Sequence, residues 1–202
     1  SDITFQVKPG ECVAIAGKNG CGKSTLMQIM AGILKPDGGE LCYFGKKAAY
    51  KSSTFRRFCG YVPQENPLME ELTVQDNLKL WGGSHNANTK ELVAQFQLED
   101  LLQTEVSKLS GGMKRRLSIA CALVENPPFL LMDEPTTALD LYYKESIHQW
   151  MKTYQQKNGI ILMTTHDESE IRNADRCLFM DEGKVQELDA EDILQKFAGM
   201  SE

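Results

Sequence analysis

Between positions 17 and 24, glycine, lysine and serine recur at a spacing that suits a chain of phosphate groups. Residues 17–25 read Gly-Lys-Asn-Gly-Cys-Gly-Lys-Ser-Thr and fit the pattern Gly-x4-Gly-Lys-Ser, with Gly17, Gly22, Lys23 and Ser24 at the fixed positions. Glycines allow the backbone N–H groups of such a loop to point at one anion. Lys23 can then reach the β- and γ-phosphates of a nucleotide, and Ser24 can ligate Mg²⁺. The spacing therefore predicts a nucleotide-binding loop.

The residues on either side of this loop predict the elements that position it. Residues 12–16 form a short apolar run, which is typical of a strand buried in a parallel sheet. After the loop, apolar residues recur at i, i+3, i+4 and i+7 from Leu26 to Ile33, which predicts a helix. The N-terminus of that helix adds its dipole to the loop. A glycine-rich turn that binds nothing is the simpler alternative, but it would not require four fixed residue types.

Two carboxylates follow a second apolar run. Residues 129–132 read Phe-Leu-Leu-Met, and Asp133 and Glu134 come directly after them. Carboxylates at the end of a buried parallel strand are costly unless they have a partner or a function. Asp133 suits a Mg²⁺ ligand, held directly or through water, and Glu134 suits the group that polarises an attacking water. A structural salt bridge is the less favoured alternative.

Polar side chains also follow two other predicted strands, at 58–62 and 160–163. Gln64 follows the first and His166 the second. Alone each signal is weak, because such a glutamine usually solvates a loop and a lone histidine is usually structural. The carboxyl ends of parallel strands meet at one edge of a sheet, so we expect both side chains beside the nucleotide loop. There Gln64 would contact Mg²⁺ or water.

A second glycine-rich helix start lies far from the first. Ser110, Gly111 and Gly112 precede a predicted helix and form another backbone nest for anions. If this nest lies on a separate helical subdomain, it cannot easily reach the phosphates of its own chain, and it would serve a nucleotide bound to another copy. The basic residues 114–116 that follow are expected to form a solvated face.

The order of predicted elements indicates an α/β protein with an insertion. Residues 2–7 alternate in polarity and predict a half-buried strand paired antiparallel with the strand at 12–16. Strands at 40–44 and 58–62 precede a helical stretch at 73–102. In this stretch Thr73 and Asp76 resemble a capping pair, and Val74, Leu78 and Trp81 fall on one stripe. A hairpin of 176–180 with 184–188 and a helix at 189–198 close the chain. We therefore expect a core formed by about 1–65 and 126–202, and a helical subdomain at 66–125.

The overall composition excludes several classes of protein. With 25% charged and 42% hydrophobic residues and a net charge of −6, the chain is typical of a globular protein and gives no sign of a nucleic-acid-binding surface. Its six cysteines form no C-x-x-C pair, which predicts buried, reduced thiols in a cytosolic protein. No apolar run is long enough to span a membrane. Any membrane span would therefore have to come from another chain.

With these residues assembled, the chain resembles the nucleotide-binding domain of an ABC transporter over essentially its whole length. The resemblance implies a P-loop NTPase core with an antiparallel β subdomain and an inserted α-helical subdomain. In the family's terms, 17–25 is the Walker A motif, Leu109 to Gly112 the signature, 129–133 the Walker B motif with catalytic Glu134 after it, and 138–140 the D-loop. The residues it assigns to ATP are Gly17, Asn19, Gly20, Cys21, Gly22, Lys23, Ser24, Thr25, Ser110, Gly111, Gly112 and Asp140. Catalysis is assigned to Glu134, His166 and Gln64, and Mg²⁺ to Ser24, Gln64 and Asp133.

The resemblance also implies partners and a location. Two such domains, identical or different, form a head-to-tail dimer in which each ATP lies between one P-loop and the partner's signature. Closure and hydrolysis drive a separate membrane permease, so the chain would be peripheral on the cytoplasmic face. Met113, where the family most often has Gln, and the basic residues after it resemble the exporter branch with ABC-2-type permeases. Export is therefore the expected direction.

Several alternatives remain open at this stage. A soluble ABC ATPase acting on the ribosome is one; a DNA-repair type is disfavoured because the helical insert has no room for a long coiled coil. A non-hydrolysing nucleotide sensor is disfavoured by the presence of Glu134 and His166, and a small-molecule kinase by the signature. Cys21 next to a helix start suggests a reactive thiol, although a small side chain is the simpler requirement there.

The family's adenine-stacking aromatic residue lies upstream of the first predicted strand, before the first residue of this chain. We therefore expect the chain as given to bind ATP more weakly than a chain extended at its N-terminus, which equilibrium titration of both would measure. Equal dissociation constants would contradict this expectation.

Overall fold

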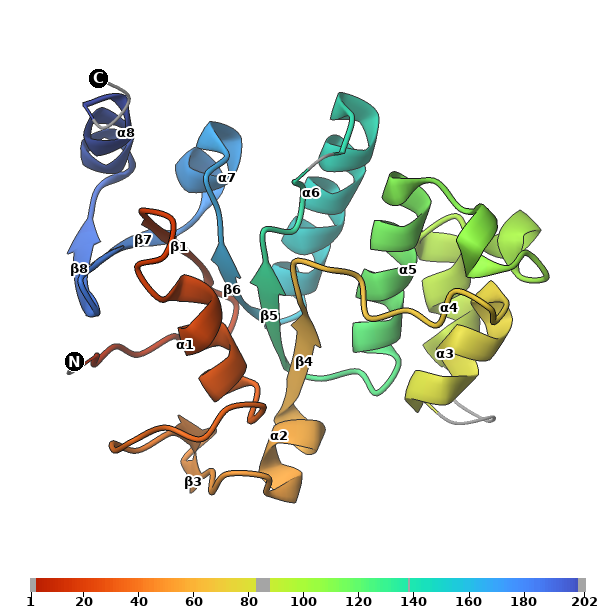
Figure 1. Cartoon of the computed structure of the whole chain (residues 1–202), viewed down its shortest axis with the longest axis horizontal. Coiled ribbons are helices and arrows are strands. Elements are labelled where there is room, and N and C mark those ends of the chain that lie inside the picture. The colour runs from red at the N-terminus through yellow and green to blue at the C-terminus, as the bar shows by residue number, and fades with distance from the viewer. Residues whose placement is uncertain (1–2, 83–87, 138, 200–202) are drawn as a thin grey trace.

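A computed structural model describes residues 3–82, 88–137 and 139–199 of the chain. Its centre is a six-stranded sheet in the order β4-β5-β6-β1-β7-β8 (Figure 1). The first five strands in this order are parallel, and β8 pairs antiparallel with β7. The strands are β1 (Cys12–Gly17), β4 (Cys59–Val62), β5 (Phe129–Asp133), β6 (Ile160–Thr164), β7 (Arg176–Asp181) and β8 (Lys184–Leu188). The predicted α/β fold with a parallel core is confirmed.

Helices cover both faces of this sheet (Figure 1). They are α1 (Lys23–Met30), α2 (Ser53–Phe58), α3 (Val74–Gly82), α4 (Asn88–Gln95), α5 (Gly111–Leu123), α6 (Leu141–Gln156), α7 (Glu168–Asn173) and α8 (Ala190–Ala198), with short 3₁₀ turns at Glu99–Leu101 and Val106–Lys108. Along β1, Val13 and Ile15 pack into a core cluster with α1, and Cys12, Ala14 and Ala16 pack into a larger cluster on the other face. A strand buried on both faces reads as a continuous apolar run, as observed.

Parallel pairing brings the ends of four strands to one edge of the sheet. Thr164 at the end of β6 lies opposite both Ile15 of β1 and Asp133 of β5 in the strand registers. The segments that follow β1, β4, β5 and β6 therefore start from the same edge, which is where ligands bind in open α/β sheets. The fold thus brings together the P-loop and the residues singled out at strand ends, whereas the glycine-rich segment at 110–112 lies elsewhere.

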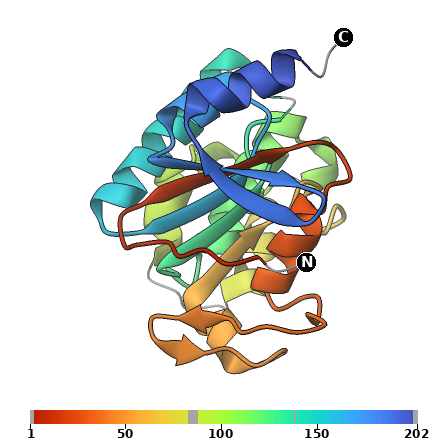
Figure 2. The same ribbon diagram turned by 90° about the vertical axis from the view of Figure 1, so that its left-hand side faces the viewer.

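The predicted N-terminal strand is wrong. Residues 3–7 keep the alternation of half-buried and exposed side chains, and Ile3, Phe5 and Val7 pack against the α1 side of the core. They form no ladder with β1, because β6 and β7 occupy both of its edges. Figure 2 shows the segment running beside the sheet as coil, held at one point by a hydrogen bond from Arg176 to the Gln6 carbonyl. Asp2, the first residue of the predicted strand, lies outside the described residues.

The predicted strand at 40–44 is shorter in the structure. It is reduced to β2 (Cys42–Tyr43), which pairs with β3 (Lys46–Lys47) in a separate two-stranded hairpin. Phe44 and Gly45 between them both have positive φ, 50° and 74°. Such a two-residue turn matches the twist of a hairpin but ends the strand at Tyr43.

Helices α3 and α4 lie within the stretch 73–102 that was predicted to be helical. The Thr73 hydroxyl accepts a hydrogen bond from the N–H of Asp76 at 3.1 Å, as expected for a cap, and α3 ends at Gly82. Trp81 was predicted on the buried stripe of this helix but is 46% exposed. At Gly82 the helix approaches α5 so closely that a Cβ would lie 1.8 Å from Cγ1 of Val124. Gly82 therefore makes the contact with α5, and the indole of Trp81 lies at the surface.

All six cysteines are free, as predicted, but they are not all buried. Cys12, Cys121 and Cys177 are buried, whereas Cys21 and Cys59 are half-buried. Cys42 is exposed, because it lies in the short hairpin β2–β3. Across the described ranges, no helix is both long and apolar enough to cross a bilayer.

Gly17 and Gly20 offer a direct test of why the loop needs glycine. A Cβ at Gly17 would lie 2.2 Å from the backbone oxygen of Met180 on β7, whereas a Cβ at Gly20 meets nothing within 4 Å. We expect Gly17→Ala to lower the free energy of unfolding by about 3 kcal/mol, because β1 and β7 must separate. Gly20→Ala, which has positive φ but open space, should cost only about 1 kcal/mol. Urea unfolding of both variants measures the difference, and equal losses would contradict it.

Candidate functional site

The loop between β1 and α1 is organised around Lys23. Its side chain is 7% exposed, and its ammonium donates hydrogen bonds to the carbonyls of Gly17 at 2.7 Å and Lys18 at 3.0 Å. The ammonium thereby fixes the loop, and its third N–H can be donated to a phosphate oxygen. Helix α1 starts after Gly22 with no side-chain cap and no acidic residue in its first turn. Its first N–H groups therefore suit an anion.

The remaining predicted P-loop residues lie where a ligand can reach them. Asn19, Gly20, Ser24 and Thr25 are exposed, and Cys21 is half-buried. The Cys21 sulfur lies beside Gly17, where a Cβ would approach it to 3.0 Å. This packing favours the simple interpretation that position 21 needs a small side chain.

Asp133 is buried at the end of β5. The residue is 3% exposed, and its carboxylate accepts a hydrogen bond from the hydroxyl of Thr164 at 2.5 Å. This bond orients the carboxylate and satisfies only one of its oxygens. Such a carboxylate, together with the Ser24 hydroxyl and the Gln64 amide oxygen, is the kind of donor set that Mg²⁺ uses when substrate phosphates and water supply the remaining ligands. The residues present therefore fit a nucleotide-bound Mg²⁺. The described residues contain no group of three or more His, Cys, Asp or Glu side chains that could hold a metal ion.

Glu134 lies at the centre of the predicted catalytic residues. Its carboxylate accepts hydrogen bonds from Gln64 at 3.2 Å and Thr137 at 3.0 Å, and its other oxygen lies 3.6 Å from Nε2 of His166. Residues from three different strand ends are thus brought together. Glu134 also has a positive φ of 49°, a conformation that costs a non-glycine residue about 1–3 kcal/mol and often marks a functional site.

The surroundings of His166 favour its neutral form. Burial lowers the pKa of this imidazole below its ordinary value, the positive charge of Lys23 lowers it further, and Glu134 opposes the shift. The ring of Phe197 on α8 packs against the histidine with 5.5 Å between ring centroids. A neutral imidazole beside Glu134 can donate or accept one hydrogen bond without forming a permanent ion pair.

The second glycine-rich segment lies on the helical side of the molecule. Ser110 caps α5, and its hydroxyl accepts from the N–H of Met113 at 3.3 Å. A Cβ at Gly111 would meet nothing within 4 Å, and one at Gly112 would press on Tyr143. Figure 1 shows α5 on the opposite side of β5 from α1. The segment is therefore open and does not join its own P-loop.

The predicted D-loop borders this segment. Asp140 caps α6 by accepting a hydrogen bond from the N–H of Tyr143 at 3.1 Å, and the ring of Tyr143 lies beside Gly112. Ala138, the first residue of the predicted D-loop, lies outside the described residues. The structure thus brings Asp140 and Gly112 to neighbouring positions on one surface.

The expectation that residues 114–116 form a solvated face is wrong. Arg115 and Arg116 are each 4% exposed. Lys114 is partly exposed and forms an ion pair with Glu70, and Arg116 lies over the ring of Tyr143. Helix α5 is buried around most of its circumference, so its arginines point into the protein and bind backbone carbonyls. The signal that could have revealed this is the apolar run after them, from Leu117 to Leu123, which has no solvated stripe.

Thr164 and Thr137 were missed by sequence reasoning. Both donate hydrogen bonds to carboxylates of the site, but threonines at strand ends and in loops are too common to single out.

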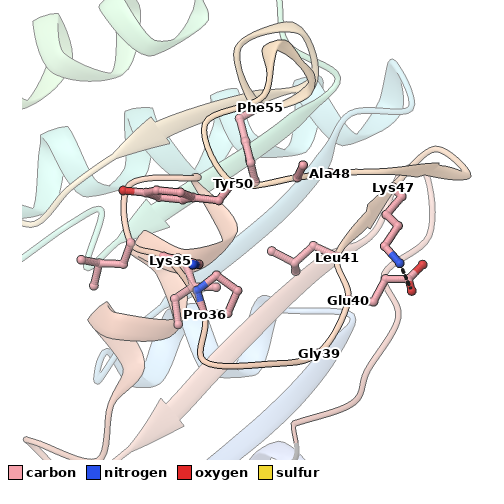
Figure 3. A pocket seen from close by; sticks show the side chains of 12 residues that line it. Lys35, Pro36, Gly39, Glu40, Leu41, Lys47, Ala48, Tyr50 and Phe55 are labelled. Atoms are coloured by element: carbon pink, nitrogen blue, oxygen red, sulfur yellow. Dashed lines mark hydrogen bonds and ion pairs between the residues drawn. The ribbon is translucent and has the colours of Figure 1, made fainter.

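A separate cavity of about 220 Å³ lies between α1, the segment after it and the β2–β3 hairpin. Figure 3 shows Pro36, Leu41 and Tyr50 lining it, with the Lys47–Glu40 ion pair at its rim. It contains none of the predicted site residues.

Comparison with known proteins agrees with this geometry. A family model described as ABC transporter matches residues 1–137. The chain belongs to the ABC transporter family. It is thus an ABC-type ATP-binding domain, an ATPase by family, and the residues that match the model include the P-loop, the signature and the Walker B motif.

Relatives of this ABC domain include transporter subunits of both directions. It is 35% identical to a Nod factor export ATP-binding protein I of Rhizobium etli over 98% of this chain and 66% of that protein. It is 34% identical to a sulfate/thiosulfate import ATP-binding protein of Xanthomonas campestris over 93% of this chain and 58% of that protein. The ABC domain therefore spans less than two thirds of the length of these relatives.

Solved ABC structures share its fold. A dimeric ATP-binding cassette in a post-hydrolysis state with ADP and Pi is 29% identical, with a TM-score of 0.84 over 94% of this chain and 89% of that chain. An ATP-binding subunit of an ABC transporter is 32% identical, also with a TM-score of 0.84, over 98% of this chain and 86% of that chain.

The environment of His166 predicts its titration. We expect its NMR titration midpoint to lie below about 6.5, the value of an exposed histidine. Because the unfolded chain then binds the proton first, His166 makes the folded state less stable as the pH falls from this value to the lower folded pKa. Phe197→Ala should expose the ring and raise the midpoint.

Comparison with His166→Gln assigns the resonance. A wild-type midpoint at or above 6.5 would contradict the burial of the imidazole, and an unchanged midpoint in Phe197→Ala would contradict the contribution of the aromatic contact.

Proposed function

We propose that this ABC domain hydrolyses ATP in a head-to-tail dimer and thereby drives export through a separate membrane permease. The observation that carries the proposal is the carboxylate of Glu134, which lies between Gln64 and His166 at the sheet edge that holds the P-loop. A carboxylate in this position can accept a proton from a water that attacks the γ-phosphate.

The residues divide the chemistry among them. The N–H groups of residues 17–25 and the Lys23 ammonium bind the phosphates. Ser24, Gln64 and Asp133 would hold Mg²⁺, which neutralises charge on the β- and γ-phosphates. Glu134 takes the proton of the attacking water, and neutral His166, which lies beside that carboxylate, donates its one N–H to the γ-phosphate that is attacked.

The signature supplies the other half of the site. Ser110, Gly111 and Gly112 lie at the start of α5, with open space at Gly111 and with Asp140 nearby. In the proposed dimer these residues bind the ATP held by the partner's P-loop, so each ATP is bound by residues of both chains. The dimeric relative with ADP and Pi supports this arrangement.

The permease would dock on the helical subdomain, which we assign to residues 66–125, against a core of 1–65 and 126–202. Exposed apolar side chains gather in and before α3: Met69, Leu72, Leu80 and Trp81. The export relatives and the form of the signature around Met113 favour an ABC-2-type exporter on the cytoplasmic face of the membrane. A soluble partner such as the ribosome would be the alternative occupant of this surface.

The first experiment uses light scattering to measure whether Glu134→Gln dimerises when ATP is added. Without the carboxylate that accepts the proton, ATP with Mg²⁺ should trap a closed dimer, and steady-state hydrolysis should fall by about 100-fold or more. A monomer that binds ATP but never dimerises, with or without an N-terminal extension, would contradict the proposal.

Changes at Ser110 separate the dimer from simple helix capping. Ser110→Trp in the Glu134→Gln background should abolish the dimer, because the indole would block the partner's nucleotide. Ser110→Ala removes the same cap without adding bulk, so it should weaken but retain the dimer. Equal behaviour of the two changes would argue that α5 stability, not a composite site, controls association.

A further inference from the structure

Arg115 is a buried arginine whose hydrogen-bond partners among the described residues are all backbone carbonyls. Its Nε donates to the carbonyl of Pro135 at 2.9 Å, and Nη2 donates to those of Asp133 at 2.8 Å and Glu134 at 2.9 Å. Nη1 donates to the carbonyls of Pro63 at 2.5 Å and Gln64 at 3.4 Å. All three nitrogens of the guanidinium are therefore engaged.

The charge of Arg115 persists despite its burial. Burial lowers the pKa of this guanidinium to about 10, opposed by the negative charges of Asp133, Glu170 and Glu134. It remains protonated at neutral pH, although no carboxylate of the described residues lies within ion-pair distance of it. A buried cation without a paired carboxylate is stable here because its N–H groups are satisfied by carbonyl dipoles.

The carbonyls belong to two loops that both carry predicted catalytic residues. Pro63 and Gln64 follow β4, and 133–135 is the end of β5 with the residues after it. Arg115 itself lies on α5, five residues after Ser110, the cap at the start of the signature helix. One planar group thus connects the signature helix to the backbone of both Gln64 and Glu134.

Arg116 provides the contrast. It is equally buried on the same helix, but its Nη1 donates to the carbonyl of Phe96 at 2.9 Å and its guanidinium lies over Tyr143. Its hydrogen bonds go to Phe96 and Gln97 in the helical part of the chain, and among the described residues none of them reaches Gln64 or Glu134. Loss of Arg116 therefore removes a buried cation without cutting the connection that Arg115 makes.

We propose that Arg115 is a positioning residue that couples the signature helix to the two catalytic loops. When the signature binds the ATP held by the partner's P-loop, Arg115 sets Gln64 and Glu134 in place to hydrolyse the ATP of their own chain. This inference rests on the proposed function. It predicts that a change at Arg115 slows hydrolysis without preventing ATP binding or closure. A residue that only stabilised α5 would affect closure and hydrolysis together.

The test compares Arg115→Lys with Arg116→Lys. Lysine keeps the charge but cannot reach five carbonyls with one compact ammonium. We expect kcat of Arg115→Lys to fall by about tenfold or more, as for a small misplacement of catalytic groups, with KM for ATP changed less than about twofold. In the Glu134→Gln background, Arg115→Lys should form the ATP-dependent dimer at the same ATP concentration as its parent. Arg116→Lys should keep kcat within about threefold of wild type.

Hydrogen exchange of Arg115→Gln and Arg116→Gln gives a second readout that needs no turnover. Exchange in the segments 64–66 and 134–137 should rise together in Arg115→Gln and stay unchanged in Arg116→Gln. Equal kcat in the two lysine variants, or exchange that rises in only one segment, would overturn the coupling. If the wild type does not hydrolyse ATP, the proposed function fails, while the exchange experiment still decides whether Arg115 connects the loops.

Discussion

Thr164 lies where the segments of the site meet, and the geometry of the site depends on its contacts. Its backbone pairs β6 with both β1 and β5, so it fixes the level at which the two strands end. Its hydroxyl donates to the carboxylate of Asp133, and both its hydroxyl and its carbonyl accept from the N–H of Glu134 at 3.1 Å. The carboxylate proposed to bind the metal and the carboxylate proposed to accept the proton are thereby held at one level of the sheet. The register of the sheet at Thr164 therefore determines where the carboxylates of Asp133 and Glu134 lie.

The unusual backbone of Glu134 is held from both sides. Thr164 binds its N–H, and the guanidinium of Arg115 binds its carbonyl. A residue with positive φ persists only where its surroundings outweigh the strain. Here the surroundings belong to the sheet on one side and to the signature helix on the other. The position of the Glu134 carboxylate therefore depends on both β6 and α5, which are distant in the sequence.

The sequence was sufficient for features that depend on the local order of residue types. Asp133, Glu134 and His166 were predicted because each follows an apolar run, and parallel strands bring such positions to one edge. The wrong predictions depended on the surroundings of a segment. Residues 3–7 alternate like a strand but find no free edge of β1, and Trp81 follows a buried stripe but is displaced where Gly82 meets α5. The arginines of α5 read as a solvated run because their carbonyl partners come from distant loops.

The pairing of β1 also determines when the nucleotide loop is completed during synthesis. Its neighbours are β6 and β7, which begin at Ile160 and Arg176, whereas β1 itself begins at Cys12. Contacts across so much of the chain close late and slow the folding of a domain. On the ribosome, the strand that carries the P-loop therefore has no partner strand until β6, at residues 160–164, has emerged. Until then the nascent chain exposes an apolar strand with two open edges, which is the period in which it depends most on protection from aggregation.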